Sequence, residues 1–236
     1  IEAEKLKWNL LELDTASFET SSGEESWSFK LFAEGNLRHP FELHVDGTWQ
    51  DQITVDISNL SGTFLGTPFN LEQPIRFEHT EELFHLPKAE FTVGGSSAYI
   101  NIDRKGDQTD AQIQCDGIPL DFLSLNPLEV KVAGTLDLDA IITERNNKLQ
   151  GELKVSVNQT EPIPATGSFQ GTFNRDLLNL TGNMGVRGNP LLNVDLSIPI
   201  HFSVWPFDAE ILFHKESKGK IAFNGRIEEF LDFLNL

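Results

Sequence analysis

The chain has 236 residues, and its 36 acidic side chains outnumber its 18 basic ones, for a formal net charge of -18 at pH 7. This balance argues against a nucleic-acid partner, because neutralising phosphates requires clustered Lys and Arg, and against adsorption to an anionic lipid surface. The mean hydropathy is -0.24, and no apolar run is long enough to predict a transmembrane helix.

The length fits one large all-β domain or two smaller ones. No linker rich in Pro, Ser and Gly divides the sequence, so we expect one continuous architecture over residues 1–236. The chain begins Ile-Glu-Ala-Glu, without an initiator Met or a signal peptide. We therefore interpret it as an internal segment of a longer protein.

Strict alternation of apolar and polar residues predicts strands at 27–31, 53–57, 128–140, 149–157 and 198–204. Each such strand has one apolar and one wet face, so one face of the resulting antiparallel sheet should be continuously apolar. Turn signals separate the strands at 94–96, 105–107, 145–148, 187–190 and 218–220. Two short amphipathic segments, 118–125 and 226–234, predict helices that plug the apolar surface from the side.

A short phrase recurs inside these strands: an apolar residue, a spacer, Gly, a small or polar residue, then an apolar residue. It occurs at 45–49, 60–64, 132–136 and 149–153, and the glycines at 117, 134, 151, 167 and 182 are almost evenly spaced. A fixed period is typical of one unit stacked many times. Glycines at one level of successive strands would bend the sheet along a line, and we expect this to curl it into a trough.

Catalytic signals are weak. The sequence has no HExxH, no GxSxG, no P-loop and no GxGxxG after a strand. His79 and His85 could supply metal ligands, but their spacing matches no known site, and a solvated turn is the favoured interpretation. The single cysteine, Cys115, lies in an alternating segment and is predicted to be a small core residue. We therefore predict no enzyme activity, cofactor or metal. An all-β glycosidase, whose carboxylates need not be close in sequence, ranks lowest among the alternatives.

The second half of the chain resembles the TamB family, within the AsmA-like group of bacterial envelope proteins. Residues 196–207, LSIPIHFSVWPF, are similar to the family's strand that ends in an apolar-Pro pair and runs on to L-S-L-x-P-F. Residues 218–231 resemble its L-S-G-x-L-x-G-x-I-D-L sequence and small helix, and residues 117–151 resemble its helix-then-repeat unit. The likeness covers residues 115–236; before that, only the alternation agrees.

This resemblance implies a β-taco: a long antiparallel sheet curled into a U-shaped trough with an apolar inner face and, here, two short helices. In the family this groove is thought to carry phospholipid acyl chains across the periplasm of diderm bacteria and to support outer-membrane biogenesis. An N-terminal helix anchors the protein in the inner membrane, and its C-terminus meets the outer-membrane barrel TamA. Both of these elements would lie outside the present segment.

The candidate groove-lining residues are the apolar members of the alternating strands. They are Val130, Val132, Leu136, Leu138, Leu153, Val155, Ile198, Ile200, Phe202 and Val204. One alternative remains open at this point, because an apolar sheet face can also cover a second sheet. The chain would then be a filled β-sandwich or solenoid that binds carbohydrate or protein in the cell envelope.

Overall fold

A computed structural model of the chain consists almost entirely of β-strands. The structure describes residues 2–8, 11–24, 26–37, 39–50, 54–80, 82–123, 132–146, 148–203, 208–212 and 215–225. Its strands are β1 (Glu2–Trp8), β2 (Leu11–Ser22), β3 (Trp27–Leu37), β4 (His39–Trp49), β5 (Thr54–Phe64), β6 (Thr67–Leu71), β7 (Ile75–His79), β8 (Leu83–Val93), β9 (Ser96–Lys105), β10 (Gln108–Pro119), β11 (Ala133–Arg145), β12 (Lys148–Glu161), β13 (Ala165–Asn174), β14 (Leu177–Val186), β15 (Asn189–Ser203), β16 (Asp208–Ile211) and β17 (Lys218–Phe223). One short helix, α1 (Leu120–Leu123), follows β10.

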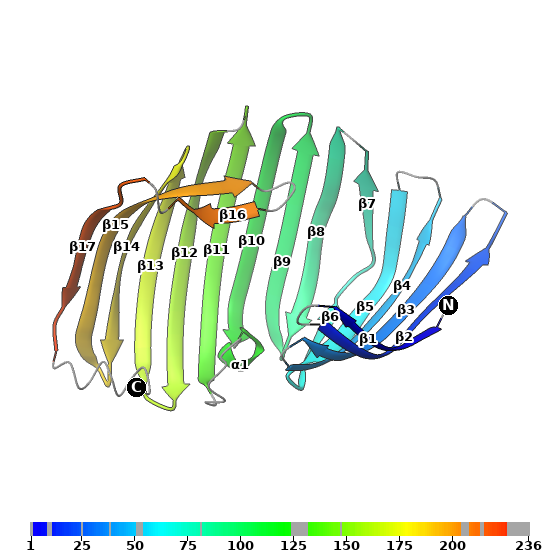
Figure 1. The fold of residues 1–236 in the computed structure, drawn as a ribbon, viewed down its shortest axis with the longest axis horizontal. Helices are drawn as coiled ribbons and strands as arrows, with labels where there is room; N and C mark the ends of the chain where they lie inside the picture. The colour runs from blue at the N-terminus through cyan, green and yellow to red at the C-terminus, as the bar shows by residue number, and fades with distance from the viewer. Residues whose placement is uncertain are drawn as a thin grey trace.

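All of these strands belong to one 17-stranded antiparallel sheet in which most strands pair with their neighbours in sequence. At one place two short strands share a position: β6 pairs with the end of β5, and β7 pairs with its beginning. Figure 1 shows a single layer of strands, in which β1–β5 lie at an angle to β8–β14. The all-β class and the antiparallel sheet expected from the sequence are thus confirmed.

The end of β15 leaves this layer. Its residues up to Pro199 pair with β14, whereas Ile200 to Ser203 pair with β16. Figure 1 shows this part of β15 and β16 crossing in front of β11–β13. We call the segments 200–203 and 208–211 the strap.

Several boundaries differ from the sequence-based expectations. The predicted helix 118–125 begins two residues later than expected, as α1, because β10 continues through Pro119; residues 124 and 125 lie outside the described residues. Residues 218–220, predicted as a turn, begin strand β17. The predicted second helix, 226–234, lies outside the described residues, as does the start of the strand predicted from residue 128.

An extra residue in β10 keeps its apolar side chains on one face. The register of β10 against β11 shifts between Cys115 and Ile118, and Gly117 takes a left-handed conformation there, with φ 68°. The Gly117 N–H donates to Asp137 Oδ1 at 2.7 Å, and its carbonyl accepts from Ser96 Oγ at 2.6 Å. Because side chains alternate along a strand, this bulge places Ile118, and not Gly117, on the same face as Cys115.

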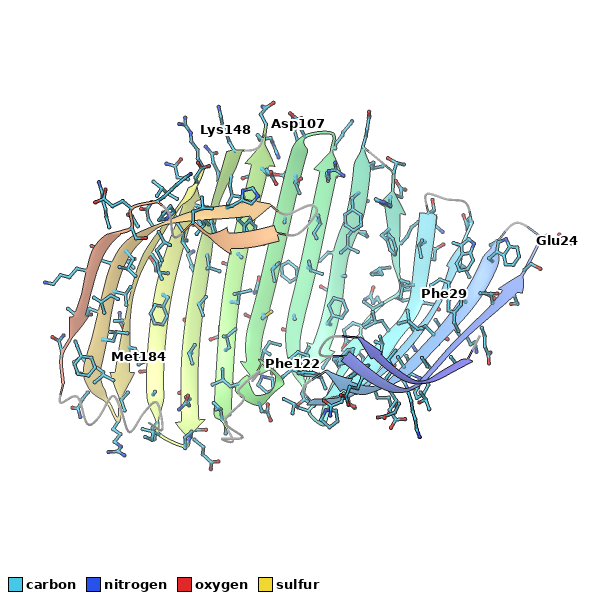
Figure 2. All side chains as sticks on the ribbon, in the orientation of Figure 1. Glu24, Phe29, Asp107, Phe122, Lys148 and Met184 are labelled. Carbon is cyan, nitrogen blue, oxygen red and sulfur yellow. The ribbon has the colours of Figure 1, made fainter. Side chains whose placement is uncertain are left out.

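Helix α1 packs onto β5 and β6. The Phe122 ring lies 5.8 Å from the Phe64 ring at 79° and 6.3 Å from the Phe69 ring at 67°, which are edge-to-face arrangements that aromatic rings favour. A Cβ added at Gly94, between β8 and β9, would lie 2.8 Å from Pro119 Cγ, so the chain leaving β10 passes close to this turn. Figure 2 shows Phe122 beside the end of β10. The predicted docking of this segment on the sheet is confirmed for Phe122.

Buried apolar side chains form two packed clusters, and further buried residues, such as Ala89 and Ile118, lie outside them. One cluster lies beneath the strap, and the other lies around the turns that join β12 to β13 and β14 to β15. The first contains Ala111, Ile142, Leu149, Phe173 and Ile200; the second contains Ala165, Val186 and Leu191. Among the described residues, these two clusters are separate and do not join into one core that runs along the whole sheet.

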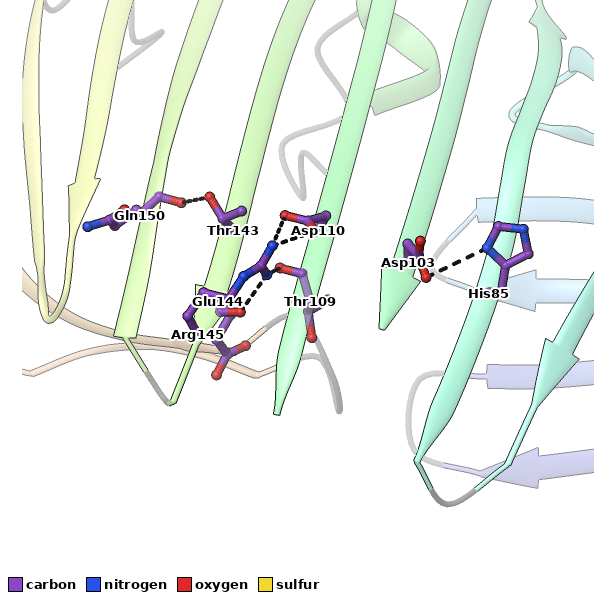
Figure 3. Close-up of polar contacts among 8 residues, drawn as sticks. All are labelled: His85, Asp103, Thr109, Asp110, Thr143, Glu144, Arg145 and Gln150. Atoms are coloured by element: carbon purple, nitrogen blue, oxygen red, sulfur yellow. Dashed lines mark hydrogen bonds and ion pairs between the residues drawn. The ribbon is translucent and has the colours of Figure 1, made fainter. Parts of the chain in front are cut away.

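Polar contacts join neighbouring strands near their ends (Figure 3). Arg145, at the end of β11, donates to both carboxylate oxygens of Asp110 on β10, at 2.6 and 2.8 Å, and to two backbone carbonyls. On β8, His85 Nδ1 lies 3.7 Å from Asp103 Oδ1 of β9. These groups are well exposed, so each pair contributes little stability.

No helix in the described part of the chain is long and apolar enough to cross a membrane.

Replacing Phe122 by Ser should loosen the sheet where α1 covers it. The loss of both ring contacts should cost about 1–3 kcal/mol of unfolding free energy, below the value for a fully buried Phe because Phe122 is only partly buried. Urea unfolding would measure the loss. Amide exchange should become faster at residues 61–64 of β5, which pair with β6.

Phe77→Ser is the matched control. Phe77 packs against Phe84, with ring centroids 6.2 Å apart, and pairs with Val55 near the other end of β5. Its exchange changes should appear at residues 54–57. Identical exchange patterns in the two variants would contradict the docking of α1 on β5 and β6.

Candidate functional site

The register of the strand pairs arranges the side chains of β8–β17 in rows that run across the sheet. Four successive rows on one face contain only apolar side chains and glycine, and each is named here after one member. The Ile198 row contains Leu86, Ile102, Ala111, Ile142, Gly151, Phe173, Leu178 and Ile198. The Leu153 row contains Ala89, Ile100, Ile113, Ala140, Leu153, Gly171, Leu180, Leu196 and Gly219.

The next two rows continue toward the other ends of the strands. The Val155 row contains Phe91, Ala98, Cys115, Leu138, Val155, Phe169, Gly182, Val194 and Ile221. The Leu136 row contains Ile118, Leu136, Val157, Gly167, Met184, Leu192 and Phe223. These four are called the apolar rows below.

The opposite face of the same strands is mostly polar, with the exposed Ile141 as an apolar exception. Between the Leu153 and Val155 rows, the intervening positions all carry polar side chains: Glu90, Tyr99, Gln114, Asp139, Lys154, Gln170, Thr181, Asp195 and Lys220. The acidic residues of the chain that lie in this row are therefore separated from the apolar rows by the full thickness of the sheet.

The apolar rows extend into the N-terminal half. Phe69 on β6 pairs with Val93 on β8, two residues from Phe91 of the Val155 row. From Phe69 the pairs lead on across β5, β4, β3 and β2, through Gly62, Leu43, Ala33 and Ala16. A neighbouring row contains Phe18, Leu31, Val45 and Leu60. The same face of the sheet thus carries apolar side chains from β2 to β17.

The structure brings most of the predicted lining residues together. Leu136, Leu138, Leu153, Val155 and Ile198 fall in the four apolar rows. Ile200 and Phe202 lie in the strap instead, where they pack on the same rows from above. Val132 precedes β11 and is partly exposed. Val130 and Val204 lie outside the described residues.

Sequence reasoning overlooked the candidates of the N-terminal half. Val45 and Leu60 belong to the recurring glycine phrase at 45–49 and 60–64, which was the available signal. Phe29, Trp49 and Trp27 form a further aromatic group there: the Phe29 and Trp49 rings lie 5.4 Å apart, and the Trp27 and Trp49 rings lie 6.3 Å apart. Trp27 is 49% exposed. Its ring therefore offers apolar surface at the strand ends.

The molecule exposes more surface than a compact protein of its size. Its solvent-accessible area is 14861 Å² for a mass of 26.4 kDa, whereas a compact monomer of that mass exposes about 10,600 Å². In the Val155 row, Leu138, Val155 and Phe169 are partly exposed, and Ile221 at its end is 62% exposed. Part of the apolar rows is therefore accessible to a ligand.

Three of the evenly spaced glycines lie on the same face as the apolar residues, but they do not lie at one level across the sheet. Gly151 falls in the Ile198 row, Gly167 in the Leu136 row and Gly182 in the Val155 row. In an antiparallel sheet, evenly spaced glycines on successive strands lie side by side only when each glycine is midway between the turns at the two ends of its strand. Gly151 follows the turn before β12 closely, and Gly167 follows the turn before β13. The expectation that aligned glycines bend the sheet along one line was therefore wrong.

Phenylalanine rings pack against several of the strand glycines, in both halves of the chain. A Cβ added at Gly47 would lie 2.6 Å from Phe29 Cζ, and one at Gly62 would lie 2.8 Å from Phe69 Cζ. At Gly182 an added Cβ would overlap the ring of Phe169, which is its partner across β13 and β14. A ring from one strand thus fills the space left by the missing side chain on the next, an arrangement that stabilises glycine in sheets.

Cys115 lies in the middle of the Val155 row, between Ala98 and Leu138. Burial among apolar neighbours raises the pKa of its thiol, and the nearby Asp116 carboxylate raises the pKa further. A half-buried thiol with a raised pKa is a poor nucleophile. The placement agrees with the expectation of a small apolar residue within the packed face.

The two histidines weighed as metal ligands lie on opposite faces. His79 pairs with Phe84, whereas His85 pairs with Glu78 and Asp103. Consecutive strand residues point to opposite sides, so these two imidazoles cannot hold one ion. Within the described residues, no three His, Cys, Asp or Glu side chains are grouped closely enough to bind a metal.

Comparisons of this chain with models of known protein families, with curated proteins and with solved structures found no match.

Replacing Gly182 by Ala should destabilise the protein, although Ala is normally the better strand residue. The new methyl group would meet the Phe169 ring and lie 2.7 Å from the Ser168 carbonyl oxygen, so we expect a loss of about 1–3 kcal/mol. Gly171→Ala is the matched control, because the closest atom there is Leu178 Cδ1, at 3.0 Å and at the end of a flexible side chain. Equal losses in urea unfolding would contradict the role of Phe169.

Alkylation of Cys115 by iodoacetamide should be slow at pH 8. Its raised pKa keeps the thiol protonated there, and the thiolate is the reactive form. The rate should keep rising above the pH at which a free thiol levels off. In urea the rate should reach that of a free thiol, measured by mass spectrometry. A folded protein that reacts as fast as the unfolded one would place Cys115 outside the apolar row.

Proposed function

We propose that this chain is an internal section of a periplasm-spanning, bridge-like protein whose apolar groove carries phospholipid acyl chains between the inner and outer membranes. The observation that carries the proposal is the set of four apolar rows, which continue from strand to strand with only apolar side chains and glycine. The resemblance of residues 115–236 to the TamB family points in the same direction.

The direction of the rows suits an acyl chain. A row runs perpendicular to the strands and advances by about 4.8 Å at each strand, so a chain lying along it passes from one strand to the next without meeting a charge. We infer that the sheet curls into a U-shaped trough, a β-taco, with the apolar rows on its inner face. Each buried methylene contributes about 0.8 kcal/mol, and charged headgroups stay in water at the open side.

This mechanism needs no catalytic residue and no cofactor. Transfer follows from the similar environment that each successive strand offers, so an acyl chain meets no large free-energy step along a row. The acidic polar face keeps the molecule soluble. We therefore propose a carrier and not an enzyme.

The location and partners of the chain follow from the same resemblance. We propose that it lies in the periplasm of a diderm bacterium as part of an inner-membrane-anchored protein that supports outer-membrane biogenesis. Regions outside this segment would supply the inner-membrane anchor and the contact with the outer-membrane barrel TamA.

A filled binding module for carbohydrate or protein is the second candidate. The buried cluster beneath the strap favours it, because Ile200 and Phe173 are less than one-tenth exposed there. A sandwich requires a second layer over the remaining rows as well. Among the described segments, the strap and α1 are those that pack on this face. The binding experiment below separates the two candidates.

Purified protein should carry lipid, detected by solvent extraction and mass spectrometry, and should bind a fluorescent fatty acid. Val155→Asp should weaken that binding by about tenfold or more, since a carboxylate in the middle of a row costs at least 1.4 kcal/mol of binding free energy. The variant should still fold, because this side chain is already partly exposed.

Ser156→Asp is the matched control. Ser156 neighbours Val155 on β12 but is exposed on the polar face, opposite Asp137 and Ser168. Its binding should stay within about twofold of the wild type, because its new charge stays in water. If the purified wild-type protein carried no lipid and did not bind the fluorescent fatty acid, the proposal would be overturned in favour of the filled module.

A further inference from the structure

The strap begins directly after a proline, Pro199, at which β15 stops pairing with β14. Pro199 is the last β15 residue to pair with β14, opposite Leu177, and proline has no N–H to continue a ladder. From Ile200 onward the chain pairs with β16 instead, over four residue pairs. The strand therefore leaves the sheet at Pro199 and crosses over the face that carries the apolar rows (Figure 1).

The strap offers its apolar side chains to the rows. Ile200 is 7% exposed and belongs to the cluster with Ile142 and Phe173. The Phe202 ring lies 5.7 Å from the Phe173 ring. His201, between them, is exposed. The face of β15 that carries Ile200 and Phe202 therefore covers the Ile198 row, while the opposite face, with His201, is exposed to water.

Asp176 contacts the chain at the start of the strap and again at Lys215, which follows the strap in sequence. The Ile200 N–H donates to the Asp176 carbonyl at 2.8 Å, and Lys215 Nζ lies 3.4 Å from Asp176 Oδ2. The Leu212 N–H donates to the Pro199 carbonyl at 2.9 Å, which closes the base. Between these points, the backbone pairing of the described strap residues joins β15 to β16 and not to the strands beneath. Beyond its base, the described part of the strap contacts the sheet through the packing of Ile200 and Phe202.

We propose that the strap is a displaceable cover that competes with acyl chains for the Ile198 row. This inference rests on the proposed function. An acyl chain offers the row the same kind of contact as Ile200 and Phe202, so the two cannot occupy it together. The hydrogen bonds at Asp176 and Pro199 keep the base in place while Ile200 and Phe202 leave the row. A closed strap lowers the apparent affinity for lipid in proportion to the fraction of molecules in which it is open.

Hydrogen–deuterium exchange of the wild-type protein, with and without saturating oleate, tests the competition directly. Residues 200–203 and 208–211 should exchange faster in the presence of oleate, because the ligand displaces the strap. Slower exchange there would overturn the inference, because it would mean that the strap closes over the ligand or lines its site.

A double variant, Ile200→Ala with Phe202→Ala, provides the second test. Removing both contacts should open the strap and tighten oleate binding by about threefold or more. His201→Ala is the matched control, and its affinity should equal that of the wild type. Unchanged or weaker binding by the double variant would overturn the strap inference while leaving the proposed function in place.

Failure of the proposed function has a different signature. The wild type, the double variant and the control would then all ignore oleate, and the exchange of the strap would not respond to it. Should the double variant not fold, the exchange experiment on the wild type alone decides the inference.

Discussion

The alternation of side chains with a period of two is the constraint on which the whole structure depends. In a meander where each strand pairs with the next, a slip of one residue would move an entire strand's apolar side chains to the wet face. The irregularities of the sheet fall where this alternation changes phase. At Gly117 the extra residue brings Ile118 opposite Leu136. Between β4 and β5 the register shifts after Asp46, so that Gly47 faces Ile57. Bulges thus preserve the separation of the faces instead of disturbing it.

Features set by neighbours in sequence could be predicted, and features set by distant contacts could not. The alternation at 149–157 gave strand β12 and the face of Val155 correctly, since both depend on the period alone. The levels of Gly151 and Gly167 depend on their distances from the turns, which the spacing does not contain. Ile200 and Phe202 have the pattern of a sheet strand, but Pro199 redirects them, and their partner Phe173 lies on another strand. Helix α1 begins at Leu120 and not at Ile118, because β10 extends to Pro119.

A sheet whose apolar face is partly exposed lacks the stabilisation that a filled core supplies, so other interactions must replace it. Backbone ladders supply part of it, since nearly every strand has a partner on each side. Aromatic rings supply another part, as at Phe169 over Gly182 and Phe29 over Gly47. The chain has 18 Phe and one Tyr, and a ring that packs over a glycine has no partner there for a hydroxyl group. The excess of acidic residues on the other face opposes the association that exposed apolar surface promotes.

The strap and the proposed ligand depend on the same interaction. A surface that binds acyl chains without a specific polar contact also binds any apolar segment of its own chain that can reach it, because hydrophobic attraction is not directional. In the proposed mechanism, residues 200–203 therefore cover the Ile198 row when no ligand does, which reduces exposed apolar area. The cost is a weaker apparent affinity. The backbone hydrogen bonds at Asp176 and Pro199 limit that cost, since they hold the base of the strap at the turn between β13 and β14, beside the Ile198 row and away from the Val155 and Leu136 rows. The uncovered rows then remain available for a first contact with lipid, from which displacement of the strap can proceed.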